Sequence, residues 1–177
     1  MASPKISLNK LGEYLDATPS RRRRIVKDQQ NPQPFIVTRY GDARDEIVNY
    51  LEGGMEEEGQ MLAAAARLRV EDAATEFARQ DKFASAEAIE DFLDAAEQLD
   101  ISGLLARGVG KSTSDVMEIS GVSVSIRPDV ILEDETNGEV VGAVKLHFSK
   151  TNPLRLRSML NSVLAVKEKY STSLQRK

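Results

Sequence analysis

Residues 121–150 read GVSVSIRPDVILEDETNGEVVGAVKLHFSK, and this stretch decides the fold expected for the chain. Apolar residues alternate with polar ones at its start, which predicts a strand over residues 122–132. Asn137-Gly138 is a strong hairpin signal, because both residue types tolerate positive φ. Residues 139–149 then form the return strand of the hairpin.

A further strand is expected at residues 116–119, so that residues 115–149 would form three adjacent strands. The remainder of the chain is mostly of helical character. Thr18-Pro19 marks one helix start, because threonine caps helices and proline suits the first turn. The expected helices cover residues 5–16, 20–30, 42–52, 55–80, 85–100 and 154–170, and residues 35–38 form a short extended piece.

This order of elements predicts a mixed α+β protein. Residues 1–54 form a helical N-terminal extension, and residues 55–177 contain acidic helices followed by a β-β-β-α core. A chain of 177 residues is long enough to bury a substantial core.

The composition excludes several functions. There is no cysteine, which rules out a disulfide scaffold and a thiol nucleophile, and a single histidine, His147, rules out a histidine-rich metal site. No apolar run approaches the roughly 20 residues that span a bilayer. The N-terminus lacks the apolar segment of a signal peptide, so we expect a cytoplasmic protein without a membrane partner.

The charge is unevenly distributed. Residues 1–50 carry a net charge of +3, residues 51–100 carry −10, and residues 101–177 carry +3, within a total of −4. The acidic total argues against a protein that coats nucleic acid nonspecifically, but it leaves room for a local basic groove.

The densest basic cluster comprises Arg21, Arg22, Arg23 and Arg24. Four successive helical residues spread around most of a turn, so two or three of them could face a phosphate backbone together. The alternative is a solvated helix. The acids of residues 85–100 mostly fall off the apolar stripe of their helix, which is typical of a solvated face and also compatible with a basic protein partner.

Residues 108–113, GVGKST, are similar to the end of a phosphate-binding loop. The full pattern requires a further glycine, and that position is occupied by Leu105. A flexible connection from a helix to a strand is therefore the better interpretation.

Residues 121–150 resemble the core of the PD-(D/E)XK nuclease superfamily, especially its RecB-like branch. The resemblance rests on Pro128-Asp129 and on Lys145, and it covers about residues 85–170. In this family an aspartate on the second strand, and an acid two residues before a lysine on the third, bind a divalent metal. The resemblance implies that Asp129 is a ligand of Mg²⁺ or Mn²⁺ and that Lys145 orients the attacking water.

The chain departs from the family at Ala143, where the second acid is expected. The backbone carbonyl of Val144 could supply one oxygen ligand. A further carboxylate would have to come from elsewhere, and Glu118 on the preceding strand is the first candidate. The acids of the preceding helix are the others, namely Glu87, Glu90 and Glu97.

Hairpin register decides whether the two motif residues share a face. A two-residue turn at Asn137-Gly138 would put Asp129 and Lys145 on opposite faces. A loop over residues 134–138 would put them on one face. In that arrangement Glu133 lies opposite Glu139, and His147 joins the site.

These residues lead to a metal-dependent nuclease that cleaves phosphodiester bonds in DNA, with RNA as a further substrate. Asp129 and Lys145 would be catalytic, and Arg127, His147 and the four arginines would contact nucleic acid. The first alternative is a catalytically degenerate copy of the fold that binds nucleic acid or a protein. The second is an interaction module in which the acidic helices meet a basic partner.

Overall fold

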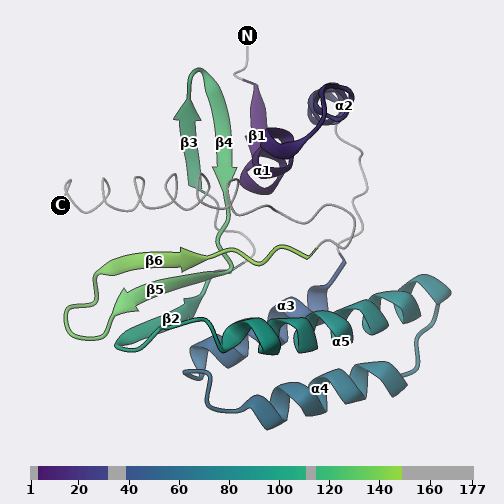
Figure 1. Cartoon of the computed structure of the whole chain (residues 1–177), viewed down its shortest axis with the longest axis vertical. Coiled ribbons are helices and arrows are strands. Elements are labelled where there is room, and N and C mark those ends of the chain that lie inside the picture. The colour runs from purple at the N-terminus through teal and green to yellow at the C-terminus, as the bar shows by residue number, and fades with distance from the viewer. Residues whose placement is uncertain (1–3, 32–38, 111–114, 149–177) are drawn as a thin grey trace. The chain divides into compact units, whose positions relative to one another are not determined.

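The computed structural model describes residues 4–31, 39–110 and 115–148 (Figure 1). In this part of the chain the fold is mixed α+β, as expected, with helices and two three-stranded sheets. The chain forms two compact units from non-contiguous segments. Unit 1 comprises Met1–Ile36, Val109–Pro128 and Val141–Lys177, and unit 2 comprises Val37–Gly108 and Asp129–Val140. The expected division at residue 54 stays a prediction.

The sheet of unit 1 has the order β1-β4-β3. Strand β1 (Lys5–Ser7) runs parallel to β4 (Val122–Ile126), and β3 (Asp115–Ile119) pairs with β4 in antiparallel fashion. Ser120 and Gly121 join β3 to β4, both at positive φ, which is the geometry of a tight hairpin turn. The alternation expected in β4 is confirmed, since Val124 and Ile126 are buried.

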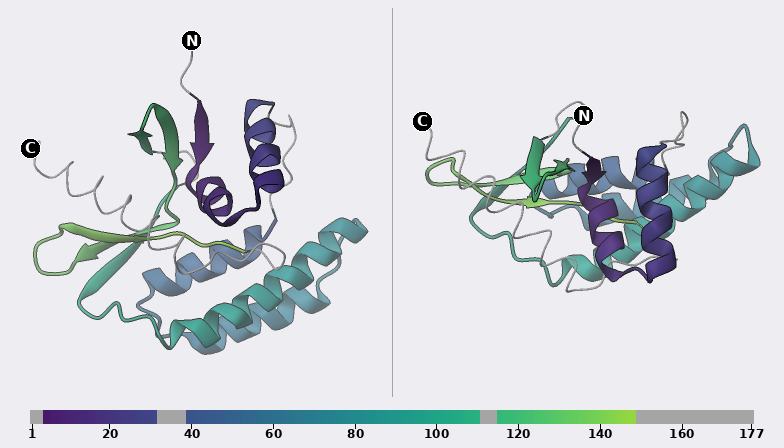
Figure 2. Two further views of the ribbon diagram at one scale, coloured as in Figure 1. Left: turned by 45° about the horizontal axis from the view of Figure 1, so that its top comes forward. Right: turned by 90° about the horizontal axis from the view of Figure 1, so that it is seen from above.

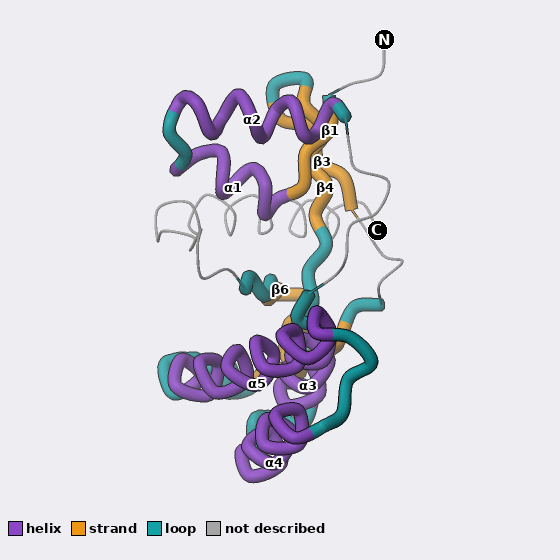
Figure 3. Tube along the Cα trace, turned by 90° about the vertical axis from the view of Figure 1, so that its right-hand side faces the viewer, coloured by secondary structure: helices purple, strands orange, loops and turns teal. Residues whose placement is uncertain are grey.

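Two helices follow β1 (Figure 3). The expected helix over residues 5–16 is wrong at its start, because residues 5–7 pair with β4 and the helix α1 (Leu8–Asp16) begins only after them. The sequence has no local signal for such a short parallel strand. Helix α2 (Pro19–Gln30) confirms the expected helix, and the Thr18 side chain accepts a hydrogen bond from Arg21 N–H at its start.

Three helices form the helical layer of unit 2. They are α3 (Gly41–Glu52), α4 (Glu58–Val70) and α5 (Glu76–Ala96), and α4 and α5 run alongside each other (Figure 2). The end of α3 before Gly53 is confirmed. The helix expected over residues 55–80 is wrong, because the chain turns between residues 71 and 75 and Thr75 caps a new helix by accepting a hydrogen bond from Ala78 N–H at 3.1 Å.

The second sheet has the order β2-β5-β6. Strand β2 (Leu104–Gly108), which the sequence analysis missed, pairs in antiparallel fashion with β5 (Val130–Asp134), and β6 (Val140–Val144) follows through a hairpin. The first two strands pair along their full length, from Leu104 opposite Asp134 to Gly108 opposite Val130.

The expectation of three adjacent strands in residues 115–149 is wrong. Residues 122–132 are not one strand: β4 ends at Ile126, β5 begins at Val130, and the two belong to different sheets. Pro128 lies in the break. Proline has no N–H to donate to a neighbouring strand, which makes it a poor residue for the interior of a sheet.

The Asn137-Gly138 hairpin is confirmed, but its turn differs from both expected forms. Gly138 N–H donates to the Asp134 carbonyl, and Asp134 N–H donates to the Glu139 carbonyl, each at 2.8 Å. Gly138 has φ of 71° while Asn137 does not adopt positive φ. The turn therefore places Glu139 opposite Asp134, with Gly138 as an extra residue on the return strand, in the manner of a glycine bulge.

The expected extended piece at 35–38 and the expected helix at 154–170 lie outside the described residues. Among the helices that are described, none combines the length and apolar character needed to cross a membrane.

Helix α3 packs directly against the end of β2. Gly108 N–H donates to the Glu52 carboxylate at 2.7 Å. A Cβ atom at Gly108 would lie 2.8 Å from Val48 Cγ1 and 3.2 Å from Glu52 Oε1. The lack of a side chain at Gly108 therefore allows the helix to approach the strand closely.

Gly108→Ala is expected to destabilise the protein by about 1–3 kcal/mol, because α3 must shift to make room for the methyl group. Urea unfolding followed by circular dichroism measures the change. Gly110→Ala is the matched control, since its Cβ would meet nothing within 4 Å. Equal unfolding free energies for the two variants would contradict the close contact between α3 and β2.

Candidate functional site

Asp129 lies immediately before β5 and is buried, with 9% of its surface exposed. Its carboxylate accepts a hydrogen bond from the Arg44 guanidinium of α3, with an Nη1–Oδ1 distance of 2.5 Å. A carboxylate removed from water needs an opposite charge or hydrogen-bond donors. Arg44 supplies both, so α3 and the start of β5 are joined by an ion pair inside unit 2.

Arg44 is the site residue that the sequence analysis missed. It is one of 24 lysine and arginine residues, and although it is the sole basic residue of α3, the sequence does not show which acid it meets. The usable signal was indirect: a buried aspartate requires a counter-charge, and an arginine on a neighbouring helix is the most suitable donor.

The remaining residues of the motif lie on and after β6. Ala143 and Val144 belong to the strand, Lys145 and His147 follow it, and all four are half-buried. Ala143 offers a methyl group where the nuclease pattern requires a carboxylate. The approach of Lys145 to Asp129 and the carbonyl ligand at Val144 stay predictions.

Glu118 was the first candidate for a second metal ligand because it was expected on a strand adjacent to that of Asp129, and this reason no longer holds. It lies on β3, whose hydrogen-bonded neighbour is β4, so it is not on a strand adjacent to β5. Its carboxylate accepts a hydrogen bond from the Ser123 hydroxyl on β4.

The helix acids behave as a solvated surface. Glu87 and Glu97 are exposed. Glu90 accepts hydrogen bonds from Arg69, and these lower the pKa of the Glu90 carboxyl. Within residues 4–31, 39–110 and 115–148, no three His, Asp or Glu side chains come together as a set able to hold a metal ion.

A divalent metal of the nuclease type does not fit these donors. Mg²⁺ and Mn²⁺ take several oxygen ligands, usually with one or two carboxylates. The single carboxylate of the motif is bound to a guanidinium, and the second position carries the methyl group of Ala143.

The four arginines of the basic cluster divide into two pairs. Arg21 donates to the Glu13 carboxylate of α1, and Arg22 donates to the carbonyls of Tyr14 and Leu15 at 3.0 and 2.9 Å. These carbonyls lie at the C-terminal end of α1, where a positive charge is favourable. Arg21 and Arg22 therefore hold α1 against α2.

Arg23 and Arg24 are exposed and make no hydrogen bond or ion pair within the described residues. Arg127, between β4 and β5, is also exposed. The sequence analysis treated the four arginines alike, because only the packing of α1 on α2 distinguishes the two pairs.

The phosphate-loop-like segment begins at Gly108, the last residue of β2, and residues 111–114 lie outside the described part. Strand β3 begins at Asp115, so the segment connects two strands of different sheets. The expected helix-to-strand connection is wrong on this point.

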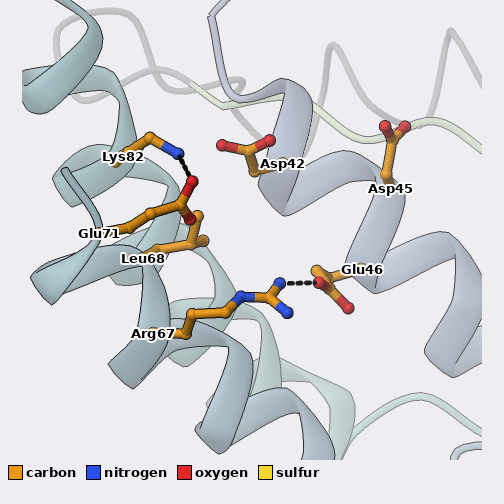
Figure 4. A pocket seen from close by; sticks show the side chains of 7 residues that line it. All are labelled: Asp42, Asp45, Glu46, Arg67, Leu68, Glu71 and Lys82. Carbon is orange, nitrogen blue, oxygen red and sulfur yellow. Dashed lines mark hydrogen bonds and ion pairs between the residues drawn. The ribbon is translucent and has the colours of Figure 1, made fainter. Parts of the chain in front are cut away.

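A separate open groove of about 460 Å³ lies among the helices of unit 2 (Figure 4). Two ion pairs cross it: Arg67 with Glu46 at 2.8 Å, and Lys82 with Glu71 at 2.7 Å. Both cationic side chains of the groove are thus paired with glutamates, and Asp42 and Asp45 give its lining an excess of negative charge.

Comparisons with protein-family models, with curated proteins and with solved structures find no match for this chain. The resemblance to the PD-(D/E)XK superfamily therefore rests on the chain's own residues and stays a prediction.

Arg44→Ala is expected to lower the free energy of unfolding by about 1–3 kcal/mol, because it leaves a buried carboxylate without its charged donor. A double-mutant cycle with Asp129→Asn measures the coupling, expected at about 0.5–3 kcal/mol. Arg107→Ala is the control: it breaks an exposed pair with Glu133 and should cost less than about 1 kcal/mol. Additive effects of the two site variants would refute the ion pair.

Glu13 provides a pH test of the contact between α1 and α2. Burial raises the pKa of its carboxyl, but hydrogen bonds from Lys10 and Arg21 outweigh this and hold the pKa below its ordinary value of 4.5. A depressed pKa stabilises the fold above the ordinary value, and this stability is lost as the pH falls through the folded-state pKa.

We therefore expect the melting temperature of the wild type to exceed that of Glu13→Gln at neutral pH, and the difference to shrink on acidification below 4.5. Thermal melts across this pH range measure it. A difference that stays constant down to the lowest pH would show that Glu13 acts through packing rather than charge.

Proposed function

We propose that this protein is a nuclease-like domain that binds nucleic acid without metal-dependent cleavage. The observation that carries the proposal is the ion pair between Arg44 and Asp129. In the nuclease pattern the aspartate faces a metal ion, whereas here a guanidinium fixed on α3 neutralises it.

The order of the strands in the sheet β2-β5-β6 supports the nuclease-like part of the proposal. The family core contains three consecutive strands, with the aspartate on the second and the lysine on the third. In the sheet β2-β5-β6, Asp129 directly precedes the middle strand and Lys145 directly follows the last. On this mapping β2 is the first core strand, and the hairpin of β3 and β4 is an insertion between the first and second.

The loss of cleavage follows from charge and ligand chemistry. Metal binding at Asp129 would have to displace Arg44 from a largely buried pair, and breaking such a pair is costly. Ala143 does not offset this cost, because its methyl side chain provides no oxygen ligand for the metal. A nucleic acid, by contrast, needs only basic side chains to neutralise its phosphates.

Metal-dependent cleavage of DNA or RNA is the second candidate. It is favoured by Pro128-Asp129 followed by Lys145 at a spacing typical of the nuclease hairpin. It requires a further carboxylate, and Glu118, Glu87, Glu90 and Glu97 are the residues to test.

The experiment compares the wild type with Ala143→Glu, which restores the acid of the nuclease pattern. Binding of labelled duplex and single-stranded DNA and RNA is measured by fluorescence anisotropy, and cleavage is measured with Mg²⁺ and with Mn²⁺. We expect the wild type to bind without cutting.

Cleavage by the wild type that is abolished in Asp129→Ala and Lys145→Ala would establish the second candidate. An inert wild type with an active Ala143→Glu variant would support a dormant nuclease site. If the wild type neither binds nor cuts any of the four nucleic acids, the proposed function is wrong and a protein-interaction module remains.

A further inference from the structure

One face of α2 carries basic side chains that the fold does not use. Arg23, Arg24 and Lys27 are exposed, and none of their side chains makes a hydrogen bond or ion pair within the described residues. Arg23 and Lys27 are four residues apart, so they lie one helical turn apart on the same side. We call these three residues the α2 basic face.

The α2 basic face borders an open groove of about 270 Å³ between α1 and α2. The groove is lined by Tyr14, Arg22, Arg23, Val26, Lys27 and Gln30. Among the described residues, no acidic side chain lines it. This differs from the helical groove of unit 2, which is lined by four acidic side chains and by two basic ones that are both paired with glutamates.

The first two arginines of α2, Arg21 and Arg22, lie against the local preference of a helix. The first turn of α2 contains no acid, and a run of four arginines begins in it, where the helix dipole disfavours positive charge. Arg21 and Arg22 compensate this through their contacts with α1. Arg23 and Arg24 lie beyond the first turn, where the effect of the dipole has faded, and they form no ion pair in the described part of the chain, so their charge is available to a partner.

The other basic residues of the helical layer show the contrast. Arg67, Arg69, Arg79 and Lys82 each form an ion pair with a glutamate. The bases of the helical layer are thus paired within unit 2, while the α2 basic face keeps its charge for a partner outside the described chain.

We propose that the α2 basic face docks the phosphate backbone of nucleic acid, with Arg21 and Arg22 acting only as internal ties. This proposal rests on the proposed function and names the surface that performs it. Charge complementarity selects a polyanion, and the one aromatic ring in the described lining of the groove is that of Tyr14, one face of which lies against the Arg22 guanidinium, 5.3 Å from the ring centroid. We therefore expect the surface to contact phosphates, with an affinity that does not depend on the base sequence of the nucleic acid.

The test measures affinity against salt concentration for a labelled duplex DNA. The variant Arg23→Gln/Arg24→Gln/Lys27→Gln is expected to bind more weakly. The slope of log affinity against log salt should fall by about 0.9 for each phosphate that the variant no longer neutralises. Its melting temperature should stay close to that of the wild type, because the three side chains form no hydrogen bond or ion pair within the described fold.

Two control variants distinguish the effect of losing positive charge from the effect of where on the protein that charge lies. Arg67→Gln/Arg69→Gln/Arg79→Gln removes the same net charge and should keep the wild-type salt slope. Arg21→Gln/Arg22→Gln should lower the melting temperature while the folded protein keeps its salt slope. Two duplexes of unrelated sequence should bind the wild type with similar affinity.

Each failure has a distinct meaning. A wild type that binds no nucleic acid overturns the proposed function and this inference together. A wild type that binds, with an unchanged salt slope in the α2 variant, overturns the inference alone. Binding of polyglutamate but not DNA or RNA, abolished in the α2 variant, would replace the nucleic acid by an acidic protein.

Discussion

The burial of one carboxylate, Asp129, constrains the architecture of unit 2. A buried carboxylate must be neutralised, and the Arg44 guanidinium does so from α3. Helix α3 is also the element that contacts α4, α5 and β2, and its Glu52 receives the Gly108 N–H at the end of β2. The helical layer and the sheet are therefore joined through α3, by polar contacts near both of its ends and by apolar residues such as Ile47 between them.

The distribution of charge along the chain becomes informative only once the contacts are known. The segment with net charge −10 contains four basic residues, and all four are paired with glutamates. The four successive arginines of α2 look equivalent in the sequence. The packing of α1 divides them into two that fix a helix pair and two that face solvent. Charge counts thus located a basic region, and hydrogen bonds identified the part of it that is available to a partner.

Local signals predicted local structure well. The Thr18-Pro19 start, the end of α3 at Gly53 and the Asn137-Gly138 hairpin were all readable, because each depends on backbone preferences of a few neighbouring residues. What the sequence could not provide was pairing between distant strands. The short strand β1 exists only through its parallel contact with β4, and β5 lies beside β2 rather than beside β3. For the same reason Asp129 was recognised as a candidate while Arg44, 85 residues away in the chain, was not.

On the proposed function, the Arg44 guanidinium lies beside Asp129 where a nuclease of the family holds a metal ion, and this changes what the site can do to a phosphate. An unpaired carboxylate repels a phosphodiester, and a nuclease overcomes this with a cation that also activates water. Arg44 removes the repulsion by neutralising the carboxylate, but a guanidinium only donates hydrogen bonds and does not coordinate water as a metal ion does, so it does not lower the pKa of the water in that way. Because Arg44 is covalently part of α3, the neutralisation requires no metal. The proposed function requires that the site tolerate a nucleic-acid backbone nearby without hydrolysing it, and the pairing of Asp129 with Arg44 is the chemical argument for that distinction.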